Sequence, residues 1–407
     1  MRNLKFIMST AILLFTFGWA NAQFESQWRG INRDGVYNET GLIRQWPAEG
    51  PKILWHYDEL GKGFTSAVVY NDKIITSGML ENTGYVFGLD LKGKLIWKTA
   101  YGKEWSESWP GCRSTPTVFD NKIYVSSSFG MAVCINVADG KILWSIDMNT
   151  AYDAKPPKWG IVESPLIVDE KVIFTTGGAV QNIVALNRLD GKMIWTSSGA
   201  GELTAYCSPL LINHNGKKII CTLTETKVLG IEAGTGKVLW TYPKKNTWSV
   251  HANTPLYYDG QIYVVSGYGS GGIMLKLSED GNTVTEVWTN TSLDNQMGGV
   301  VLLNGNLYGS GQNNKTWQCL DWKTGLLKYQ TSDLGKGVTI ANDGLLYCYS
   351  DKGDFALVKP TDTTFEIISK IKINLGSDYH WAHPVIKDKI LYLRHGNVMI
   401  AYSLAAE

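Results

Sequence analysis

Short runs of alternating hydrophobic and polar residues follow one another along most of this chain, in sets of about four. A representative set occupies residues 114–118, 122–125, 132–135 and 142–144. A period of two places alternate side chains on opposite faces, which predicts short β-strands with one face toward a core. We therefore expect antiparallel sheets built from four short strands that are consecutive in the sequence.

A five-residue motif ends most of these sets: Gly-Lys, two apolar residues and Trp. Copies lie at residues 93–97, 140–144, 191–195 and 236–240. The closing aromatic residue recurs about every 45 residues, at Trp55, Trp97, Trp144, Trp195, Trp240, Trp288 and Tyr329. Four short strands in a repeat of this length are typical of a propeller blade, so the predicted fold is an all-β propeller.

The two ends of the chain supply complementary parts of one repeat. Residues 52–55 contain the ending of the motif without its beginning. Three apolar runs near the C-terminus, 383–386, 389–393 and 398–402, have no ending of their own. Joining them makes one composite blade, and with seven units between the ends this predicts eight four-stranded blades. A ring closed by strands from both termini leaves no open end in the array of blades.

Composition and charge narrow the classes of partner. The chain is 44% hydrophobic and holds 43 Gly and 16 Trp, which suits many short strands with tight turns and aromatic packing. A net charge of +1 predicts no nucleic-acid partner and no anionic membrane partner. The six cysteines lack metal-binding spacing, and we expect mostly buried thiols, with Cys207–Cys221 as the pair to expect if a disulfide forms.

The first 22 residues have the pattern of a secretory signal peptide. Arg2 and Lys5 precede an apolar stretch over residues 6–20, and Ala20-Asn21-Ala22 supplies the small residues of a cleavage site. The alternative is a membrane anchor, for which the apolar stretch is short. The residue directly after the cleavage site is Gln23 rather than a cysteine, so we expect a periplasmic or secreted protein that is not a lipoprotein and has no membrane span. Residues 23–50 then form an extended arm, and 51–407 the propeller.

The repeat resembles a known family. An Ala or Gly, an apolar residue, Asp or Asn, and then Gly-Lys and Trp, as at 88–97, is similar to the pyrroloquinoline quinone (PQQ) repeat. That repeat occurs in quinoprotein alcohol dehydrogenases and in BamB-like outer-membrane assembly lipoproteins, and the resemblance covers roughly residues 50–404. It implies that the repeat Trp packs between neighbouring blades, which assigns a docking role to Trp55, Trp97, Trp144, Trp195, Trp240 and Trp288. Propellers of the WD type are the competing interpretation, but their Gly-His and Trp-Asp dipeptides are absent from the expected places.

Candidate functional residues lie where the chain enters the innermost strand of each blade, because these entries open on one mouth of the central channel. Ser-Pro, Thr-Pro and His-Pro mark several entries, and the side chains just before them are Arg113, Glu163, Tyr206, Asn253 and His383. Alignment of the other blades adds Thr65, Met297 and Lys336. Aromatic residues crowd the same loops, at Trp105, Trp109, Trp159, Trp248, His251, Tyr379, His380 and Trp381.

From this set we predict a ligand site at the funnel mouth made of Arg113, Glu163, Asn253, Lys336, His383, Trp109, Trp159, Trp248 and Trp381. Aromatic walls around a few polar groups suit a flat ligand such as a quinone or a sugar ring. The alternative is that the aromatic residues cover the propeller face or dock the N-terminal arm.

Two classes of function remain open. We favour a non-catalytic propeller that binds a protein or glycan partner on its face; the alternative is a PQQ-dependent alcohol or sugar dehydrogenase that uses calcium. Glu163 and Asn253 supply only two oxygen ligands for calcium, and a structural hydrogen bond is the favoured role. The spacing of His380 and His383 places them on opposite faces of an extended segment, so no metal site is expected. The adjacent cysteine pair and long insertions of many quinoprotein dehydrogenases are missing, and no catalytic residue is assigned.

Overall fold

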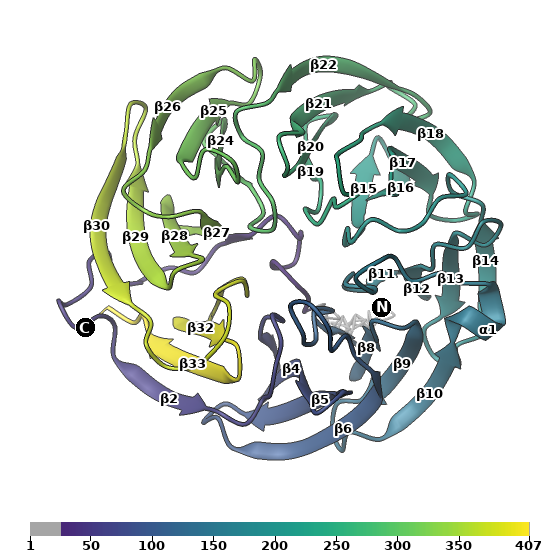
Figure 1. Ribbon diagram of the computed structural model, residues 1–407, viewed down its shortest axis with the longest axis horizontal. Helices are drawn as coiled ribbons and strands as arrows, with labels where there is room; N and C mark the ends of the chain where they lie inside the picture. The colour runs from purple at the N-terminus through teal and green to yellow at the C-terminus, as the bar shows by residue number, and fades with distance from the viewer. Residues whose placement is uncertain (1–25, 407) are drawn as a thin grey trace, which may run out of the picture.

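The computed structural model describes residues 26–406, which form a ring of eight antiparallel blades around a central channel (Figure 1). The predicted all-β propeller and its eight blades are confirmed. Seven sheets contain four strands and one contains five. The predicted signal peptide, residues 1–22, lies outside the described residues.

Each blade is a meander that runs from the channel to the outside. Blade one contains β3 (Val68–Tyr70), β4 (Lys73–Leu80), β5 (Thr83–Asp90) and β6 (Leu95–Lys103), and blade two contains β7 (Thr117–Phe119), β8 (Lys122–Ser126), β9 (Met131–Asn136) and β10 (Ile142–Asp147). Blade three contains β11 (Leu166–Val168), β12 (Lys171–Thr175), β13 (Ile183–Asn187) and β14 (Met193–Ser197), and blade four contains β15 (Leu210–His214), β16 (Lys217–Leu223), β17 (Lys227–Glu232) and β18 (Val238–Pro243). A one-turn helix, α1 (Met148–Tyr152), follows β10.

Blade five contains β19 (Leu256–Tyr258), β20 (Gln261–Ser266), β21 (Gly271–Leu277) and β22 (Val284–Asn290). Blade six contains β23 (Val301–Leu303), β24 (Asn306–Ser310), β25 (Trp317–Asp321) and β26 (Leu327–Thr331). Blade seven contains β27 (Gly337–Asn342), β28 (Leu345–Ser350), β29 (Asp354–Pro360) and β30 (Phe365–Lys372). Blade eight contains β31 (Val385–Lys387), β32 (Ile390–His395), β33 (Val398–Ser403) and β2 (Ile53–Tyr57).

The eighth blade closes the ring. β2, from the N-terminal part of the chain, pairs antiparallel with β33, and Trp55 lies opposite Ala401. Two of the expected innermost runs, 114–118 and 383–386, begin as strands only after their prolines, at Thr117 and Val385. Proline has no N–H to donate to a sheet, which accounts for the later start.

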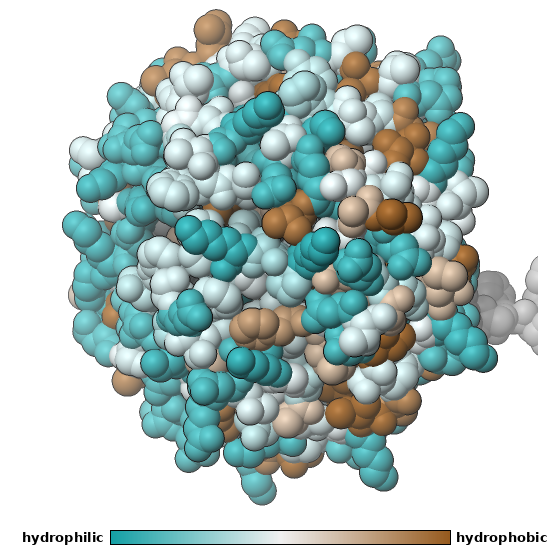
Figure 2. Space-filling view, turned by 45° about the vertical axis from the view of Figure 1, so that its right-hand side comes forward, coloured by the Kyte–Doolittle hydropathy of each residue, from teal (hydrophilic) through white to brown (hydrophobic). Residues whose placement is uncertain are grey.

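The core lies between blades rather than within one. One cluster, for example, joins Val68 and Ile75 of blade one to Val118 and Ile123 of blade two. The outermost strands carry exposed apolar residues, often two in succession, as at Ile53 and Leu54 or Ile142 and Leu143. Figure 2 shows small hydrophobic patches scattered among hydrophilic residues on one face. All six cysteines are buried and free, including the Cys207 and Cys221 thiols.

The repeat motif explains how blades dock. The Trp97 indole donates to the carbonyl of Val137 in the next blade at 3.1 Å. The same ring fills the space above Gly140, where an added Cβ would lie 2.7 Å from it. The glycine of one motif therefore makes room for the tryptophan of the preceding blade. Equivalent pairs are Trp55 with Gly93, Trp144 with Gly191, Trp195 with Gly236 and Trp288 with Gly325.

Trp240 departs from this pattern. It is buried against β20 and β21 of the next blade, but its indole nitrogen has no hydrogen-bond partner within the described residues. The next blade has no glycine placed over its ring, because the turn between β21 and β22 differs from the motif. Trp240 therefore docks its blade by apolar packing alone.

The N-terminal arm enters the central channel (Figure 1). Its residues Val36 and Tyr37 form β1 (Val36–Tyr37), which pairs parallel with β27 and gives blade seven its fifth strand. The expected arm thus includes a short strand, which the Asn- and Gly-rich sequence does not indicate.

Two arginines of the arm, Arg29 and Arg33, are each only 1% exposed. Arg33 donates to the carbonyls of Ser164 and Pro209 at 3.0 and 2.9 Å, and also to that of Pro165. Arg29 donates to the carbonyl of Val300 at 2.8 Å. The arm therefore joins blades on opposite sides of the channel and fills its centre.

Candidate functional site

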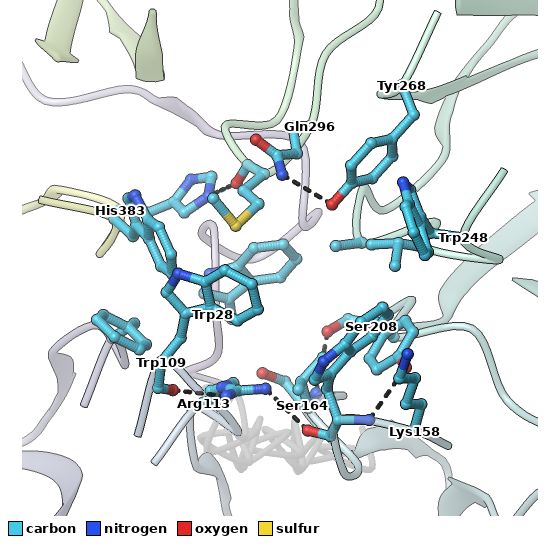
Figure 3. A pocket seen from close by; sticks show the side chains of 18 residues that line it. Trp28, Trp109, Arg113, Lys158, Ser164, Ser208, Trp248, Tyr268, Gln296 and His383 are labelled. Carbon is cyan, nitrogen blue, oxygen red and sulfur yellow. Dashed lines mark hydrogen bonds between the residues drawn. The ribbon is translucent and has the colours of Figure 1, made fainter. Parts of the chain in front are cut away.

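A pocket of about 590 Å³ lies at the mouth of the channel, next to the arm. Figure 3 shows its side chains arranged around a common open space. Its walls are mainly aromatic. They come from the arm, from the loops that enter the innermost strands and, for Tyr268, from the loop between β20 and β21: Trp28, Phe64, Trp109, Trp159, Tyr206, Trp248, Tyr268 and Trp381. This is the composition and size of a small-molecule pocket.

The structure brings six of the nine predicted site residues together on this pocket: Arg113, His383, Trp109, Trp159, Trp248 and Trp381. The other three, Glu163, Asn253 and Lys336, do not line it. Lys336 lies on a small adjoining cleft, where its ammonium group donates to the side-chain oxygen of Gln296 at 3.1 Å.

Glu163 is buried beside the channel, and both carboxylate oxygens accept hydrogen bonds from Thr175, one from the backbone N–H at 2.6 Å and one from the hydroxyl. Burial raises the pKa of the Glu163 carboxyl to about 7, although the bonds from Thr175 and the Arg33 guanidinium oppose the rise. The carboxyl group therefore has internal partners and does not face the pocket.

Asn253 is also committed to internal hydrogen bonds. Its amide nitrogen donates to the carbonyl of Asn295 at 2.8 Å, and its side-chain oxygen accepts from the N–H of Gly299 at 3.0 Å. Neither Asn253 nor Glu163 offers an oxygen to the pocket, so the pair does not fit a calcium ion bound beside a quinone. Over residues 26–406 there is no group of three or more His, Cys, Asp and Glu side chains placed to hold a metal ion.

His383 is held as a neutral ring with both nitrogens occupied. Nδ1 accepts from the Arg29 guanidinium at 3.2 Å, since arginine only donates, and Nε2 donates to the carbonyl of Met297 at 3.1 Å. Burial, together with the charge of Arg29, lowers the pKa of His383 to about 3. The Trp28 ring packs edge-on against it at 5.0 Å, so His383 has a positioning role in the pocket wall.

Arg113 fixes the positions of two wall tryptophans. Its guanidinium donates to the backbone carbonyl of Trp159 at 2.8 Å and to that of Trp109 at 2.6 Å. Trp109 has a φ of 54°, which is an unfavourable backbone conformation for any residue other than glycine. The hydrogen bond from Arg113 helps to stabilise this conformation. Arg113 therefore fixes the backbone of the two loops that carry Trp109 and Trp159.

Several lining residues were not predicted from the sequence, notably Trp28, Lys158, Tyr268 and Gln296. Lys158 holds its ammonium group 4.9 Å from the ring centre of Trp159 and 5.9 Å from that of Trp248. Its position next to Trp159 in the sequence was the one available signal. Trp28 had no comparable signal, because only the path of the arm through the channel brings it to the pocket.

The charge of the pocket is one-sided. Arg113 and Lys158 both line it, and no Asp or Glu does. Its remaining polar groups are the His383 ring, hydroxyls and an amide. Among the hydroxyls, that of Tyr206 accepts from the backbone N–H of Trp159 at 3.3 Å. The arrangement favours a flat, partly apolar ligand over a cation.

Comparison with known proteins connects this fold to a family. The family model described as outer membrane protein assembly factor BamB matches residues 82–331, which is more than half of the chain. The chain belongs to this BamB-like family of PQQ-repeat propellers. The expected resemblance is confirmed, including its quinoprotein branch.

Individual relatives of this BamB-like chain differ in kind. The outer membrane protein assembly factor BamB of Kangiella koreensis is 25% identical over 36% of this chain and 36% of its own length. The quinoprotein alcohol dehydrogenase PedH of Pseudomonas putida is 26% identical over 36% of this chain and 25% of its own length. The match thus spans only about a third of the length of the first relative and a quarter of the length of the second.

A solved structure titled europium-containing methanol dehydrogenase aligns with a TM-score of 0.66 and 13% identity, over 90% of this chain and 89% of that one. This likeness supports the fold alone. The relatives that match this chain thus include both an assembly factor and a quinoprotein dehydrogenase. Between residues 26 and 406, no helix has the length and apolarity of a membrane span.

Proposed function

We propose that this BamB-like propeller is an exported, non-catalytic binding protein that holds a protein or glycan partner at its funnel mouth. The observation that carries the proposal is the chemistry of the pocket wall. Its surface is aromatic, and His383, which borders it, is neutral with both ring nitrogens occupied. Glu163, the buried acid beside the channel, has both oxygens bonded to Thr175. Neither residue is free to move a proton to or from a bound ligand.

The exposed tryptophans at the mouth of the pocket supply most of the contact surface for a ligand. Trp248 is 52% exposed and Trp109 is 45% exposed. Exposed indoles of this kind give a large contact area and a preference for flat partners. The arm and the Arg113 clamp hold the wall in place before a partner arrives, which lowers the entropy cost of binding.

Export is the second part of the proposal. It is supported by the signal-peptide pattern of residues 1–22, which predicts a periplasmic or secreted protein. The residue after the predicted cleavage site is Gln23 rather than a cysteine, so we propose an exported protein that is not a lipoprotein. Fractionation of cells that express the full chain tests it, with N-terminal sequencing of the exported form expected to begin near Gln23.

The alternative is a PQQ-dependent dehydrogenase, favoured by the flat aromatic pocket, its two cationic side chains and the quinoprotein relatives. Bound PQQ would supply the oxidation of an alcohol or sugar. Glu163 and Asn253, the two residues considered as ligands for its calcium, are bonded elsewhere, and we derive no catalytic step for this chain.

A glycan array probed with purified protein tests the binding function. The double variant Trp159→Ala/Trp248→Ala is expected to lose the signal with little change in melting temperature, because both indoles are at the rim. Trp105→Ala is the control, since Trp105 lies in the loop between β6 and β7, which also carries Trp109, but does not line the pocket. Dye reduction by alcohols or sugars after addition of PQQ and calcium would overturn the non-catalytic assignment.

A further inference from the structure

We propose that the ligand of this pocket is an acidic sugar ring, the end of a glycan that carries a carboxylate, with Lys158 binding the carboxylate. The inference rests on the proposed binding function and deepens it. It is carried by the charge of the pocket, by the position of Lys158 between two indoles and by the hydroxyl groups around them.

Lys158 has no counter-charge. It is exposed, and it takes part in no ion pair within residues 26–406. Arg113 differs, because the buried Glu104 carboxylate lies close enough to interact with its charge. The pocket therefore presents one ammonium group whose charge is not balanced by the protein, and an anion is its natural complement.

The surroundings of Lys158 select a ring. The Trp159 and Trp248 rings lie 6.4 Å apart at 65°, so they form two walls of a corner. The ammonium group lies near both ring faces, which holds it in place by cation–π attraction. A pyranose ring offers an apolar C–H face to an indole while its carboxylate reaches the ammonium group.

Hydroxyl groups complete the match to a sugar. The Tyr206 and Tyr268 hydroxyls accept hydrogen bonds from the Trp159 N–H at 3.3 Å and from the Gln296 amide at 2.8 Å. Each keeps its own O–H to donate. Sugar hydroxyls accept such bonds, whereas an aromatic acid, which shares the flat ring and the carboxylate, leaves these donors without partners. A uronic acid therefore fits the pocket better than an aromatic acid.

The test uses isothermal titration of the purified chain with short oligogalacturonates and oligomannuronates. The matched ligand is the methyl ester of the same oligomer, which keeps the ring and removes the charge. We expect the acid to bind about tenfold more tightly than the ester. Lys158→Gln should abolish that preference, and the exposed Lys92→Gln, on the outer rim, should keep it.

The outcomes separate the two proposals. Equal binding of acid and ester that is lost in Trp159→Ala/Trp248→Ala overturns the acidic ligand and leaves the binding function standing. Binding of benzoate or naphthoate without binding of either uronate overturns the glycan assignment. An acid preference that survives Lys158→Gln overturns the role of this lysine. Absence of binding to every uronate overturns the inference. A negative glycan array for the wild type also overturns a glycan as the partner, and the binding function then rests on a protein partner alone.

Discussion

At the scale of single residues, Glu163 couples the stability of the channel wall to pH. Its pKa is raised from an ordinary value of 4.5 to about 7 in the folded protein, mainly by burial. Below the lower value both states hold the proton. As pH rises from there toward the folded value, the unfolded state loses its proton first, and the folded state becomes less stable by roughly 3 kcal/mol at most.

Glu163→Gln should remove this dependence, because glutamine is neutral at every pH and its oxygen still accepts from the Thr175 N–H. Between about pH 5 and pH 8, the unfolding free energy of the wild type should fall relative to that of the variant by about 1–3 kcal/mol. Urea unfolding at several pH values measures this difference. A difference that is constant or rises with pH would contradict the raised pKa.

Gly140 offers a second test at this scale. Its φ is 73°, and an added Cβ would lie 2.7 Å from the Trp97 ring. Gly305 has a similar φ of 76° with no atom within 4 Å of such a Cβ. Gly140→Ala should therefore cost about 1–3 kcal/mol more unfolding free energy than Gly305→Ala, because only the first also displaces a docked tryptophan. Equal losses would show that the Trp97 contact does not depend on this glycine.

At the scale of elements, the N-terminal arm behaves as part of the core, although its sequence is polar. Arg33 is fully enclosed and donates to backbone carbonyls of two blades. A buried guanidinium is stable only when its donors are satisfied, and the carbonyls at the inner ends of the blades satisfy them. The arm, in turn, supplies Trp28 to the pocket wall.

Arg33→Met should lower the unfolding free energy by about 3–5 kcal/mol, because it leaves buried carbonyls without donors. The matched control is Arg44→Met in the same arm. Arg44 pairs with Asp343 at the surface, where its side chain is 58% exposed, and its loss should cost less than about 1 kcal/mol. Equal effects in guanidinium chloride unfolding would show that the arm is not anchored through the channel.

At the scale of the whole molecule, the ring is held by the pairing of β2 with β33 (Figure 1). Each blade buries its faces against two neighbours, so an open ring exposes apolar surface at both free ends. The strength of the fold is therefore shared around the ring, and the chain ends are as essential as any central blade.

Deletion of residues 381–407 removes three strands of blade eight and leaves β2 without its partner. We expect the truncated protein to show no cooperative thermal transition by circular dichroism or calorimetry. A truncated protein that melts like the full chain would contradict closure as the source of stability.

The repeat allowed the eight-bladed propeller to be predicted from the sequence. Trp55 and the runs after residue 383 complete one blade only if the termini meet, and a period of two is a local property that each strand displays by itself. Tryptophans such as Trp97 keep their spacing because five of the blades dock on the next blade by the same contact between tryptophan and glycine. Six of the nine expected site residues share one pocket for the same reason, since blade register places them at one mouth.

Only the tertiary structure shows that Trp28 and Lys158 line the pocket and that Glu163 is bonded to Thr175. These contacts join side chains from separate parts of the chain. The channel centre is shared by eight blades and an arm, and no periodic pattern specifies which residues converge there. Burial of Arg33 and neutralisation of His383 follow from that convergence, because a desolvated group takes its charge and its partners from whatever surrounds it. Blade number and order thus follow from local repetition, whereas the chemistry of the mouth follows from packing across the ring.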